Sequence, residues 1–321
     1  MHNPLRIGTR GSGLALWQAR AVATRLEAAG IASELVIVRT AGDRLQEAPL
    51  SEIGGKRLFV KELEEALLRQ EIDAAVHSAK DMPALLPEEL ALAATLPRED
   101  PRDALVLPAH GTGGDLPAVL SQLSASPRVG TSSIRRITQL MPLLPGGTFA
   151  PIRGNVDSRL RKLDEGQYDV LVLAAAGLRR LGLADRISVA IPARQCVPAP
   201  GQGIVALEIR ADDEGTRGVL QVVHDHRASV ALDAERTVVA ALGGGCQLPL
   251  GALATLHGDE LDLQGIVCAP DGSHMVRARA TGAAADARSI GERVARELAD
   301  SGAVDILDLV RSEQGPVEGS Y

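Results

Sequence analysis

Apolar and polar residues alternate along the first hundred residues in two different patterns. Short apolar runs at residues 5–8, 34–39 and 72–77 predict strands. Longer segments at residues 14–29 and 58–70 predict helices, because their apolar residues recur every three or four positions. Since strand and helix follow each other in turn, we expect a parallel sheet covered by helices.

A second unit of the same kind follows a polar segment at residues 97–103, which two prolines mark as a candidate hinge. Three prolines and two glycines at residues 192–203 indicate a second crossing between the units. A strand at residues 204–209 would then rejoin the first unit and make it discontinuous. Within the second unit we expect strands at residues 104–107, 128–130 and 169–173 and helices near residues 116–123, 133–141 and 156–165.

From about residue 216 the pattern changes to a long helix, at residues 228–242, followed by alternating segments with hairpin turns between them. The turns Gly258-Asp259 and Pro270-Asp271-Gly272 predict a three-stranded antiparallel sheet. The chain is therefore expected to be an α/β protein with two helix-covered lobes and a small C-terminal α+β domain. The expected domains are residues 1–100 with 203–219, residues 101–198 and residues 220–321, the last with strands at 250–257, 260–268 and 274–280 and a final helix at 284–300.

The amino-acid composition disfavours some classes of binding partner. The 321 residues carry 34 basic and 41 acidic side chains, and only 2% are aromatic. Nucleic-acid binding favours a basic surface and aromatic stacking platforms, so we expect no nucleic-acid partner. The start shows no secretion signal, and the longest apolar run, residues 170–178, is far shorter than the ~20 residues of a membrane helix. We therefore expect a cytoplasmic protein with no membrane partner.

The three cysteines have no CxxC spacing, so neither a disulfide framework nor a metal site is expected. Cys196 and Cys268 lie among apolar neighbours and are expected to be buried and unreactive. Cys246 differs, because it follows the glycine run at residues 243–245. Glycines remove the side chains around the sulfur and leave room for a bulky group attached to it.

Arg10 and Ser12 lie where the first predicted strand runs into a helix. Free backbone amides, a hydroxyl and a basic side chain at a helix N-terminus make an anion site. The neighbouring glycines do not have the spacing of a dinucleotide-binding fingerprint. The alternative is an ordinary helix cap with a solvent-facing arginine.

The second unit repeats this arrangement twice. Arg135 and Arg136 follow Ser132 in the first turns of a predicted helix, where the helix dipole disfavours arginine unless an anion is bound. Arg153 and Arg159 flank the start of the next helix. Arginine takes carboxylates in two-point fashion, so a cleft between the units would grip a ligand with several carboxylates or phosphates. A solvated basic face is the alternative for Arg135 and Arg136.

Lys80 and Asp81 follow the predicted buried strand at residues 72–77, and ligands bind at the carboxyl ends of such strands. Asp81 is a candidate for proton transfer or cation stabilisation, with a surface ion pair as the alternative. His77, a lone histidine at the strand end, is more simply explained as a structural residue. The long polar stretch at residues 42–55 is typical of a mobile lid.

Eight blocks of sequence, taken together, resemble porphobilinogen deaminase, also called hydroxymethylbilane synthase. They occur in order from Arg10 to about Gly251, whereas the last 70 or so residues carry little of the match. The blocks are RGS (10–12), GGKRLFVKE (54–62), HSAKDMP (77–83), REDPRD (98–103), GTSSIRR (130–136), RGNV (153–156), GQG (201–203) and GGCQ (244–247).

The resemblance implies a monomeric transferase of porphyrin and heme biosynthesis, with two lobes like type II periplasmic binding proteins and a small C-terminal domain. Four porphobilinogen molecules would join head to tail, each losing ammonia, on a covalent dipyrromethane cofactor. Water would then release the linear tetrapyrrole hydroxymethylbilane. No metal is implied.

The resemblance also implies roles for particular residues. Cys246 would carry the dipyrromethane through a thioether. Asp81 would be catalytic, hydrogen-bonding pyrrole nitrogens and stabilising the azafulvenium cation that forms when the amino group leaves. Cofactor contacts would come from Lys80, Asp81, Ser132, Arg135, Arg136, Arg153 and Arg159, substrate carboxylates would be held by Arg10, Ser12, Arg153, Arg159 and Arg180, and Lys56 and Phe59 would belong to the lid.

Two other functions fit parts of the sequence. A non-catalytic pair of anion-binding lobes would explain the arginines, but it would leave Cys246 unexplained. A cysteine-nucleophile acyltransferase would need a histidine base, and His224, His226, His257 and His274 are available by sequence. For Phe59, an ordinary place in a helix core is the alternative to a lid.

Overall fold

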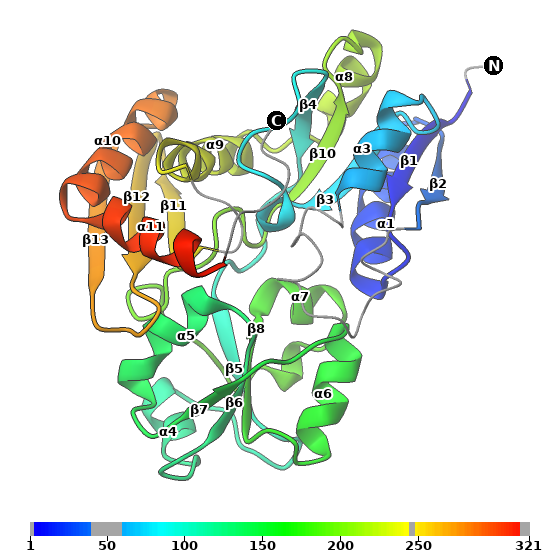
Figure 1. Cartoon of the computed structure of the whole chain (residues 1–321). Helices are drawn as coiled ribbons and strands as arrows, with labels where there is room; N and C mark the ends of the chain where they lie inside the picture. The colour runs from blue at the N-terminus through cyan, green and yellow to red at the C-terminus, as the bar shows by residue number, and fades with distance from the viewer. Residues whose placement is uncertain (1–2, 40–59, 244–247, 315–321) are drawn as a thin grey trace.

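The structure, a computed structural model, describes residues 3–39, 60–243 and 248–314. It contains two lobes, one above the other in Figure 1, and a C-terminal unit beside the upper one. Cys246 and the predicted lid residues Lys56 and Phe59 lie outside the described residues. Among those that are described, no helix combines the length and apolar character needed to cross a bilayer.

A five-stranded sheet forms the centre of the first lobe. Its strands lie in the order β2 (Ser33–Ile37), β1 (Leu5–Thr9), β3 (Ala74–Ser78), β10 (Val205–Arg210) and β4 (Leu90–Thr95). The predicted return of the chain to this sheet is confirmed by β10. The expectation of an all-parallel sheet is wrong, because β10 enters directly from the second lobe and runs antiparallel to both β3 and β4.

Helices cover both faces of this sheet. The helix α1 (Gly13–Ala28) packs on one face and α3 (Lys61–Leu68) on the other. Successive residues of a strand point to opposite faces, so Ala74 lies in the core under α1 while Ala75 lies in the core under α3. This burial on both faces explains why β3 has no polar alternation in the sequence.

The second lobe has the same architecture. Its strands lie in the order β7 (Thr148–Ala150), β6 (Arg128–Gly130), β8 (Val170–Ala174), β5 (Asp103–Val106) and β9 (Val189–Ala190). The first crossing of the chain leads into β5, which runs antiparallel to β8, as β10 does to β3. One face is covered by α4 (Leu116–Leu120) and α5 (Ile134–Leu140), the other by α6 (Val156–Asp164) and α7 (Ala175–Arg180).

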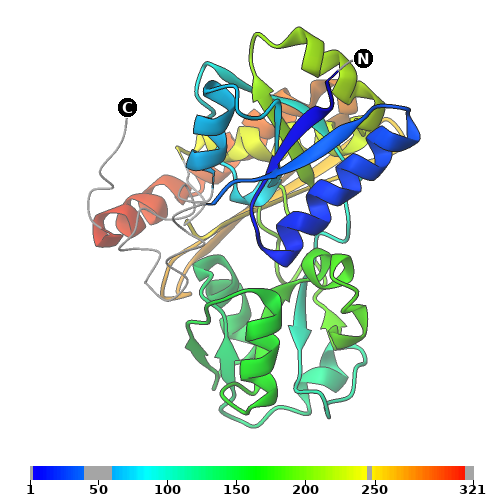
Figure 2. The same cartoon turned by 90° about the vertical axis from the view of Figure 1, so that its right-hand side faces the viewer.

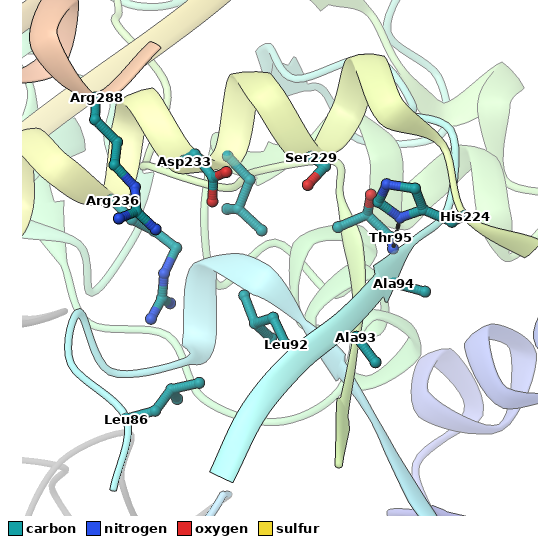
Figure 3. Close-up of a pocket in the computed structure, with 11 residues that line it drawn as sticks. Leu86, Leu92, Ala93, Ala94, Thr95, His224, Ser229, Asp233, Arg236 and Arg288 are labelled. Carbon is teal, nitrogen blue, oxygen red and sulfur yellow. Dashed lines mark hydrogen bonds between the residues drawn. The ribbon is translucent and has the colours of Figure 1, made fainter. Parts of the chain in front are cut away.

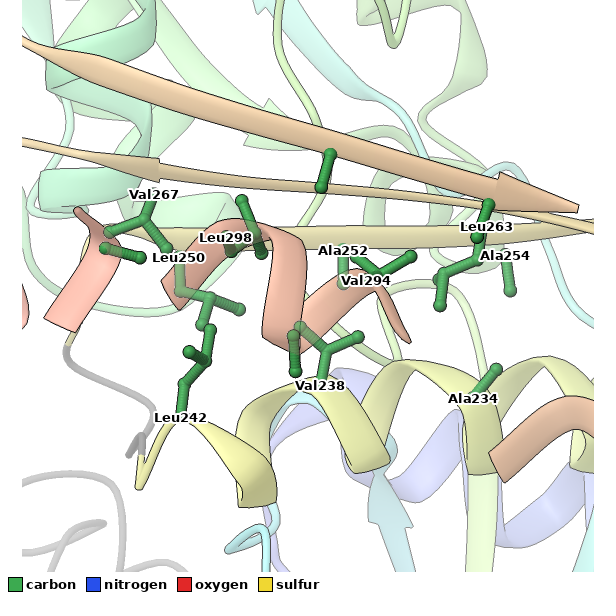
Figure 4. Packing of buried hydrophobic residues seen from close by; sticks show 14 of the residues in the cluster. Ala234, Val238, Leu242, Leu250, Ala252, Ala254, Leu263, Val267, Val294 and Leu298 are labelled. Atoms are coloured by element: carbon green, nitrogen blue, oxygen red, sulfur yellow. The ribbon is translucent and has the colours of Figure 1, made fainter. Parts of the chain in front are cut away.

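The C-terminal unit packs helices on one face of an antiparallel sheet, as predicted. After α8 (Glu214–Leu220), the elements are α9 (His226–Ala241), β11 (Leu250–His257), β12 (Glu260–Cys268), β13 (Met275–Ala283), α10 (Ala287–Asp300) and α11 (Ala303–Gln314). Figure 4 shows Val238 of α9 and Val294 of α10 directed toward the strand residues Leu250 and Ala252. The helix α11 lies beyond the predicted last helix.

The other face of this sheet packs against the second crossing of the chain. Leu253, Ile266 and Cys268 form a buried cluster with Val197 of that crossing. The predicted burial of Cys268 is therefore confirmed, and burial raises the pKa of its thiol. The C-terminal unit is thus attached to the segment where the chain passes between the lobes.

Candidate active site

The two predicted arginine loops of the second lobe begin at neighbouring points. They follow β6 and β7, which pair in parallel, so both leave the sheet at the same edge. Ser132 connects them, because its Oγ donates to the carbonyl of Ile152 and accepts from the amide of Ile152, both at 3.0 Å. Ser132 therefore holds the loop of Arg135 and Arg136 against the loop of Arg153.

The anion that offsets the arginines at the start of α5 is Asp103, at the beginning of β5. Arg135 Nη1 lies 2.8 Å from Asp103 Oδ2, and Arg136 Nη2 lies 2.7 Å from Asp103 Oδ1. The arginines are only 4% and 8% exposed, so the alternative of a solvated basic face is wrong. Burial raises the pKa of Asp103, but the two guanidinium charges outweigh it and hold that pKa well below its usual range.

Two further arginines, Arg153 and Arg159, lie close to this cluster. Burial, and after it the charges of Arg136 and Arg153, lower the pKa of Arg159 to about 10. The Asp81 carboxylate acts in the opposite direction and favours the charged guanidinium. The structure therefore brings Asp81 of the first lobe within electrostatic reach of Arg159 of the second. The backbone holds Arg159 in place, since its Nε donates to the carbonyl of Gly154 at 2.8 Å.

Lys80 and Asp81 lie in a short 3-10 turn, Ala79–Asp81, that directly follows β3. Lys80 Nζ donates to Gln202 Oε1 at 3.3 Å, and Gln202 Nε2 donates to Asp103 Oδ1 at 2.9 Å. A continuous polar connection thus runs from Lys80 to the arginine cluster. His77 points elsewhere, since its Nε2 lies 3.0 Å from Glu208 Oε2 inside the sheet, which favours the structural interpretation.

The remaining predicted carboxylate ligands lie on other elements. Ser12 caps α1, with its Oγ accepting from the amide of Ala15 at 3.4 Å, and Arg10 is half-buried at the end of β1. Arg180 on α7 donates to the carbonyl of Gly203 at 2.6 Å, and its guanidinium lies 5.5 Å from the centre of the Trp17 ring. Burial lowers the pKa of Arg180 to about 10. Arg180 therefore joins the second lobe to α1, whose N-terminal end points toward that lobe in Figure 2.

Cys196 is also part of the buried cluster. Its Sγ lies 3.5 Å from Asp103 Oδ2, and burial raises the pKa of the thiol to about 12. Because the thiolate is the reactive form, this cysteine is inert at neutral pH, as predicted. Within residues 3–39, 60–243 and 248–314, no group of three or more His, Cys, Asp or Glu side chains is arranged to hold a metal ion.

Glu235 is a further buried acid that sequence reasoning missed. It lies on α9, is fully buried and pairs with Arg98 of the first crossing at 2.5 Å. Its other oxygen accepts from the amide of Gly201 in the second crossing at 2.6 Å. The available signal was an acid on an otherwise apolar helix face, between Ala234 and Val238.

Asp103 and Gln202 were missed as individual residues, although both lie in blocks that were recognised. The available signal for Asp103 was an acid placed directly before a buried apolar strand. Nothing local marks Gln202, because its partners lie more than 90 residues away in the chain.

A separate cavity of about 340 Å³ lies between β4 and α9. Figure 3 shows Arg236 and Arg288 near Asp233, with Ser229 and His224 farther along α9 and the chain before it. Burial raises the pKa of Asp233, and the charges of the nearby cations oppose that rise. None of the predicted site residues lines this cavity, so it is distinct from the arginine cluster.

The family models and the curated relatives described below all belong to one family. Residues 5–218 match the family described as "Porphobilinogen deaminase, dipyromethane cofactor binding domain", and residues 230–300 match "Porphobilinogen deaminase, C-terminal domain". The porphobilinogen deaminase of Syntrophobacter fumaroxidans is 46% identical over 308 residues, which cover 95% of this chain and 97% of the relative. That of a Roseiflexus species is 48% identical over 309 residues, covering 96% and 99%.

Among the solved structures that the chain matches is a periplasmic substrate-binding protein of an ABC transporter from Coxiella burnetii. It is 12% identical and covers 69% of this chain and 92% of its own, with a TM-score of 0.42. The sequence matches extend over nearly the whole chain, through both lobes and the C-terminal unit. The chain belongs to the porphobilinogen deaminase family.

Proposed function

We propose that Asp81 is the catalytic residue of this member of the family and that the arginine cluster holds the carboxylates of cofactor and substrate. The family reaction condenses four porphobilinogen molecules with loss of ammonia and releases hydroxymethylbilane. The observation that carries the proposal is that the charge of Asp81 acts on Arg159, which the charges of Arg136 and Arg153 also reach.

The charge of the cluster fits a ligand with several carboxylates. Arg136 and Arg153 both lower the pKa of Arg159, so the positive charges there repel one another. A bound carboxylate would relieve that repulsion and form two-point hydrogen bonds with a guanidinium group. Each porphobilinogen brings an acetate and a propionate, so a growing chain needs several such partners.

The same residues fit the dipyrromethane cofactor, which supplies a covalent primer for chain growth when bound to Cys246. We propose that the cofactor is held by Lys80, Asp81, Ser132, Arg135, Arg136, Arg153 and Arg159, and that substrate carboxylates meet Arg10, Ser12, Arg153, Arg159 and Arg180. The support is that Ser132 joins two arginine loops and that Asp103 offsets only part of their charge.

The proposed chemistry of Asp81 is electrostatic. As the amino group leaves porphobilinogen, positive charge develops on the pyrrole, and a fixed carboxylate stabilises it. The same carboxylate can accept a hydrogen bond from the pyrrole N–H and hold the ring in orientation. The Asp81 charge in turn favours the charged form of Arg159, so the two groups support each other electrostatically.

We also propose the domain limits 1–100 with 203–219, 101–198 and 220–321, and a cytoplasmic monomer without nucleic-acid partners. The sheet order supports the limits, since β10 belongs to the first sheet although it follows the second lobe. The net charge of −7 supports the absence of nucleic acid.

The intact mass of the purified protein tests the proposed attachment of the cofactor. We expect an excess of two pyrrole units on the native chain and none on a Cys246→Ser variant, because an alcohol is a far weaker nucleophile than a thiolate. Cys268→Ser is the matched control and should keep the excess, since that thiol is buried. An equal excess on native and Cys246→Ser chains would refute the attachment at Cys246.

Arg159→Gln should raise the KM for porphobilinogen by about tenfold or more, the value of a lost hydrogen bond between charged groups. In the cofactor-free Cys246→Ser background, Arg159→Gln should raise the thermal stability of the protein, because it removes a partly buried charge that Arg136 and Arg153 repel. The cost of that charge is fully present below about pH 10, the lowered pKa in the folded protein, and shrinks only as the pH rises from there toward the ordinary arginine value.

Arg161→Gln on the same helix is the control for this prediction. Arg161 is exposed and lies 3.8 Å from Glu165, so its loss should change neither KM nor stability measurably. An unchanged KM for Arg159→Gln would exclude it as a carboxylate ligand.

A further inference from the structure

The side chain of Gln202 lies buried between the lobes, in the second crossing of the chain, and is 1% exposed. Its Oε1 accepts from Lys80 Nζ at 3.3 Å. Its Nε2 donates to the carbonyl of Pro101 at 2.7 Å and to Asp103 Oδ1 at 2.9 Å. One amide therefore contacts the turn that carries Asp81, the first crossing, and the acid that holds Arg135 and Arg136.

Only a primary amide matches this set of partners. A cation approaches on one side and needs an acceptor, whereas a carboxylate and a carbonyl on the other side need donors. A glutamate at position 202 would offer no donor and would set a second carboxylate against Asp103. A methionine would have a similar length, but its thioether has no N–H to donate and is only a weak hydrogen-bond acceptor.

The backbone on both sides of Gln202 fits tightly against its neighbours. Gly201 has a φ of 74°, and a Cβ there would lie 3.0 Å from the amide nitrogen of Lys80. Gly203 has a φ of 89°, and a Cβ there would lie 2.3 Å from the carbonyl oxygen of Glu99. Both positions require glycine: Gly201 packs against the turn after β3, and Gly203 packs against Glu99 of the first crossing.

Hydrogen bonds fix the same segment. The carbonyl of Gln202 accepts from Arg98 Nε at 2.9 Å, and the carbonyl of Ile204 accepts from the amide of Ala79 at 3.0 Å. The main chain of Gln202 therefore has little freedom to shift. Its side chain therefore extends from a fixed backbone and contacts Lys80 in one lobe and Asp103 in the other.

We propose that Gln202 is a positioning residue that sets the spacing between Lys80 and Asp81 in the first lobe and the Asp103 cluster in the second. The proposal rests on the catalytic role proposed above for Asp81. Reacting groups must be held in a narrow geometry, and a displacement of about 1 Å can cost on the order of 10²-fold in rate. The arginines keep their bonds to Asp103 without Gln202, so carboxylate binding depends on it far less.

The test is the Gln202→Met variant, with rates expressed per molecule that carries the cofactor, as counted by intact mass. We expect kcat to fall by about 10- to 100-fold and KM to change by less than about twofold. A purely structural role would instead lower stability and leave kcat per loaded enzyme unchanged. That outcome would overturn the proposal.

Gln139→Met is the matched control. Gln139 is 3% exposed and, like Gln202, uses both ends of its amide, with partners at Val197 and the carbonyl of Arg135. It contributes similar buried hydrogen bonds but none to Lys80. We expect a similar loss of thermal stability with kcat within about threefold of the native value. Equal losses of kcat in both variants would contradict a specific role for Gln202.

A double-mutant cycle separates this inference from the function it rests on. If Gln202 acts through Lys80, its substitution should have little further effect on kcat in a Lys80→Met background. Additive losses would overturn the positioning role and leave the proposed function standing. A native kcat for Lys80→Met would instead contradict the role of Lys80 itself. Lys80→Arg replaces Lys80→Met in the cycle if the latter purifies without cofactor.

Discussion

Asp81→Asn is expected to lower the turnover of porphobilinogen by about 10²- to 10³-fold, the usual loss when one preorganised electrostatic partner of a transition state is removed. Asparagine has the same shape but no charge, so the pyrrole can still be hydrogen-bonded while its developing cation loses its counter-charge. Arg159 would also lose a carboxylate that favours its charged form. The measurement is the initial rate of hydroxymethylbilane formation at saturating substrate, per loaded enzyme.

Two further variants sharpen this prediction. Asp81→Glu keeps the charge but moves it by one methylene, so its loss of turnover should be smaller than that of Asp81→Asn. Asp115→Asn is the control, because Asp115 caps α4 and asparagine caps a helix equally well. If Asp81→Asn retained more than about a tenth of the native turnover, the carboxylate charge would not be part of catalysis.

Asp103→Asn should have the largest effect on stability, a loss of about 3–5 kcal/mol in the free energy of unfolding. The variant leaves two buried arginines without their shared counter-ion, and the charges of Arg135 and Arg136 then repel each other at the start of α5. The measurement is denaturant unfolding of the cofactor-free protein in the Cys246→Ser background, which isolates the fold from ligand binding.

The pH dependence of this loss has a definite sign. The folded protein holds the pKa of Asp103 well below its usual range, so its contribution is fully present above the pKa of the unfolded chain. The difference between the native protein and Asp103→Asn should therefore be constant above about pH 5 and shrink as the pH falls below about 4. Asp308→Asn is the control and should cost less than about 1 kcal/mol, because its pair with Arg311 is exposed. A similarly small loss for Asp103→Asn would show that the two arginines do not depend on it.

The elements with a strong local pattern were predicted closely from the sequence. The strands at residues 250–257 and 260–268 agree with β11 and β12 at both ends, because clear alternation is combined with a hairpin turn. The antiparallel direction of β5 and β10 was not foreseen, since direction depends on the side from which the chain enters a sheet. The strand β4 was missed because its alanines, Ala91, Ala93 and Ala94, give little contrast with a helix.

The position of the arginine loops at the ends of strands was also predicted from the sequence. Arginine loops at strand ends were recognised because residue type and position both indicate anion binding. The buried Asp103 pairs with two of those arginines through tertiary contacts, which no local sequence pattern predicts. The roles of Cys246, Lys56 and Phe59 stay predictions, since these residues lie outside the described part of the chain.

Membership of the family also decides between the functions first considered. A pair of anion-binding lobes without catalysis would not account for matches that continue through the C-terminal unit. The acyltransferase hypothesis fails on the same ground.

Glu235 connects the two crossings between the lobes to the C-terminal unit. Its carboxylate binds Arg98 in one crossing and Gly201 in the other, and it does so from the helix that leads into the Cys246 loop. If the lobes swing about the two crossings, they must either break this buried ion pair or carry α9 with them. Breaking it would leave an unpaired charge in the interior, which costs several kcal/mol. Any rotation of the lobes about the two crossings is therefore coupled to movement of α9 and the C-terminal unit, so the three parts of the molecule cannot shift independently.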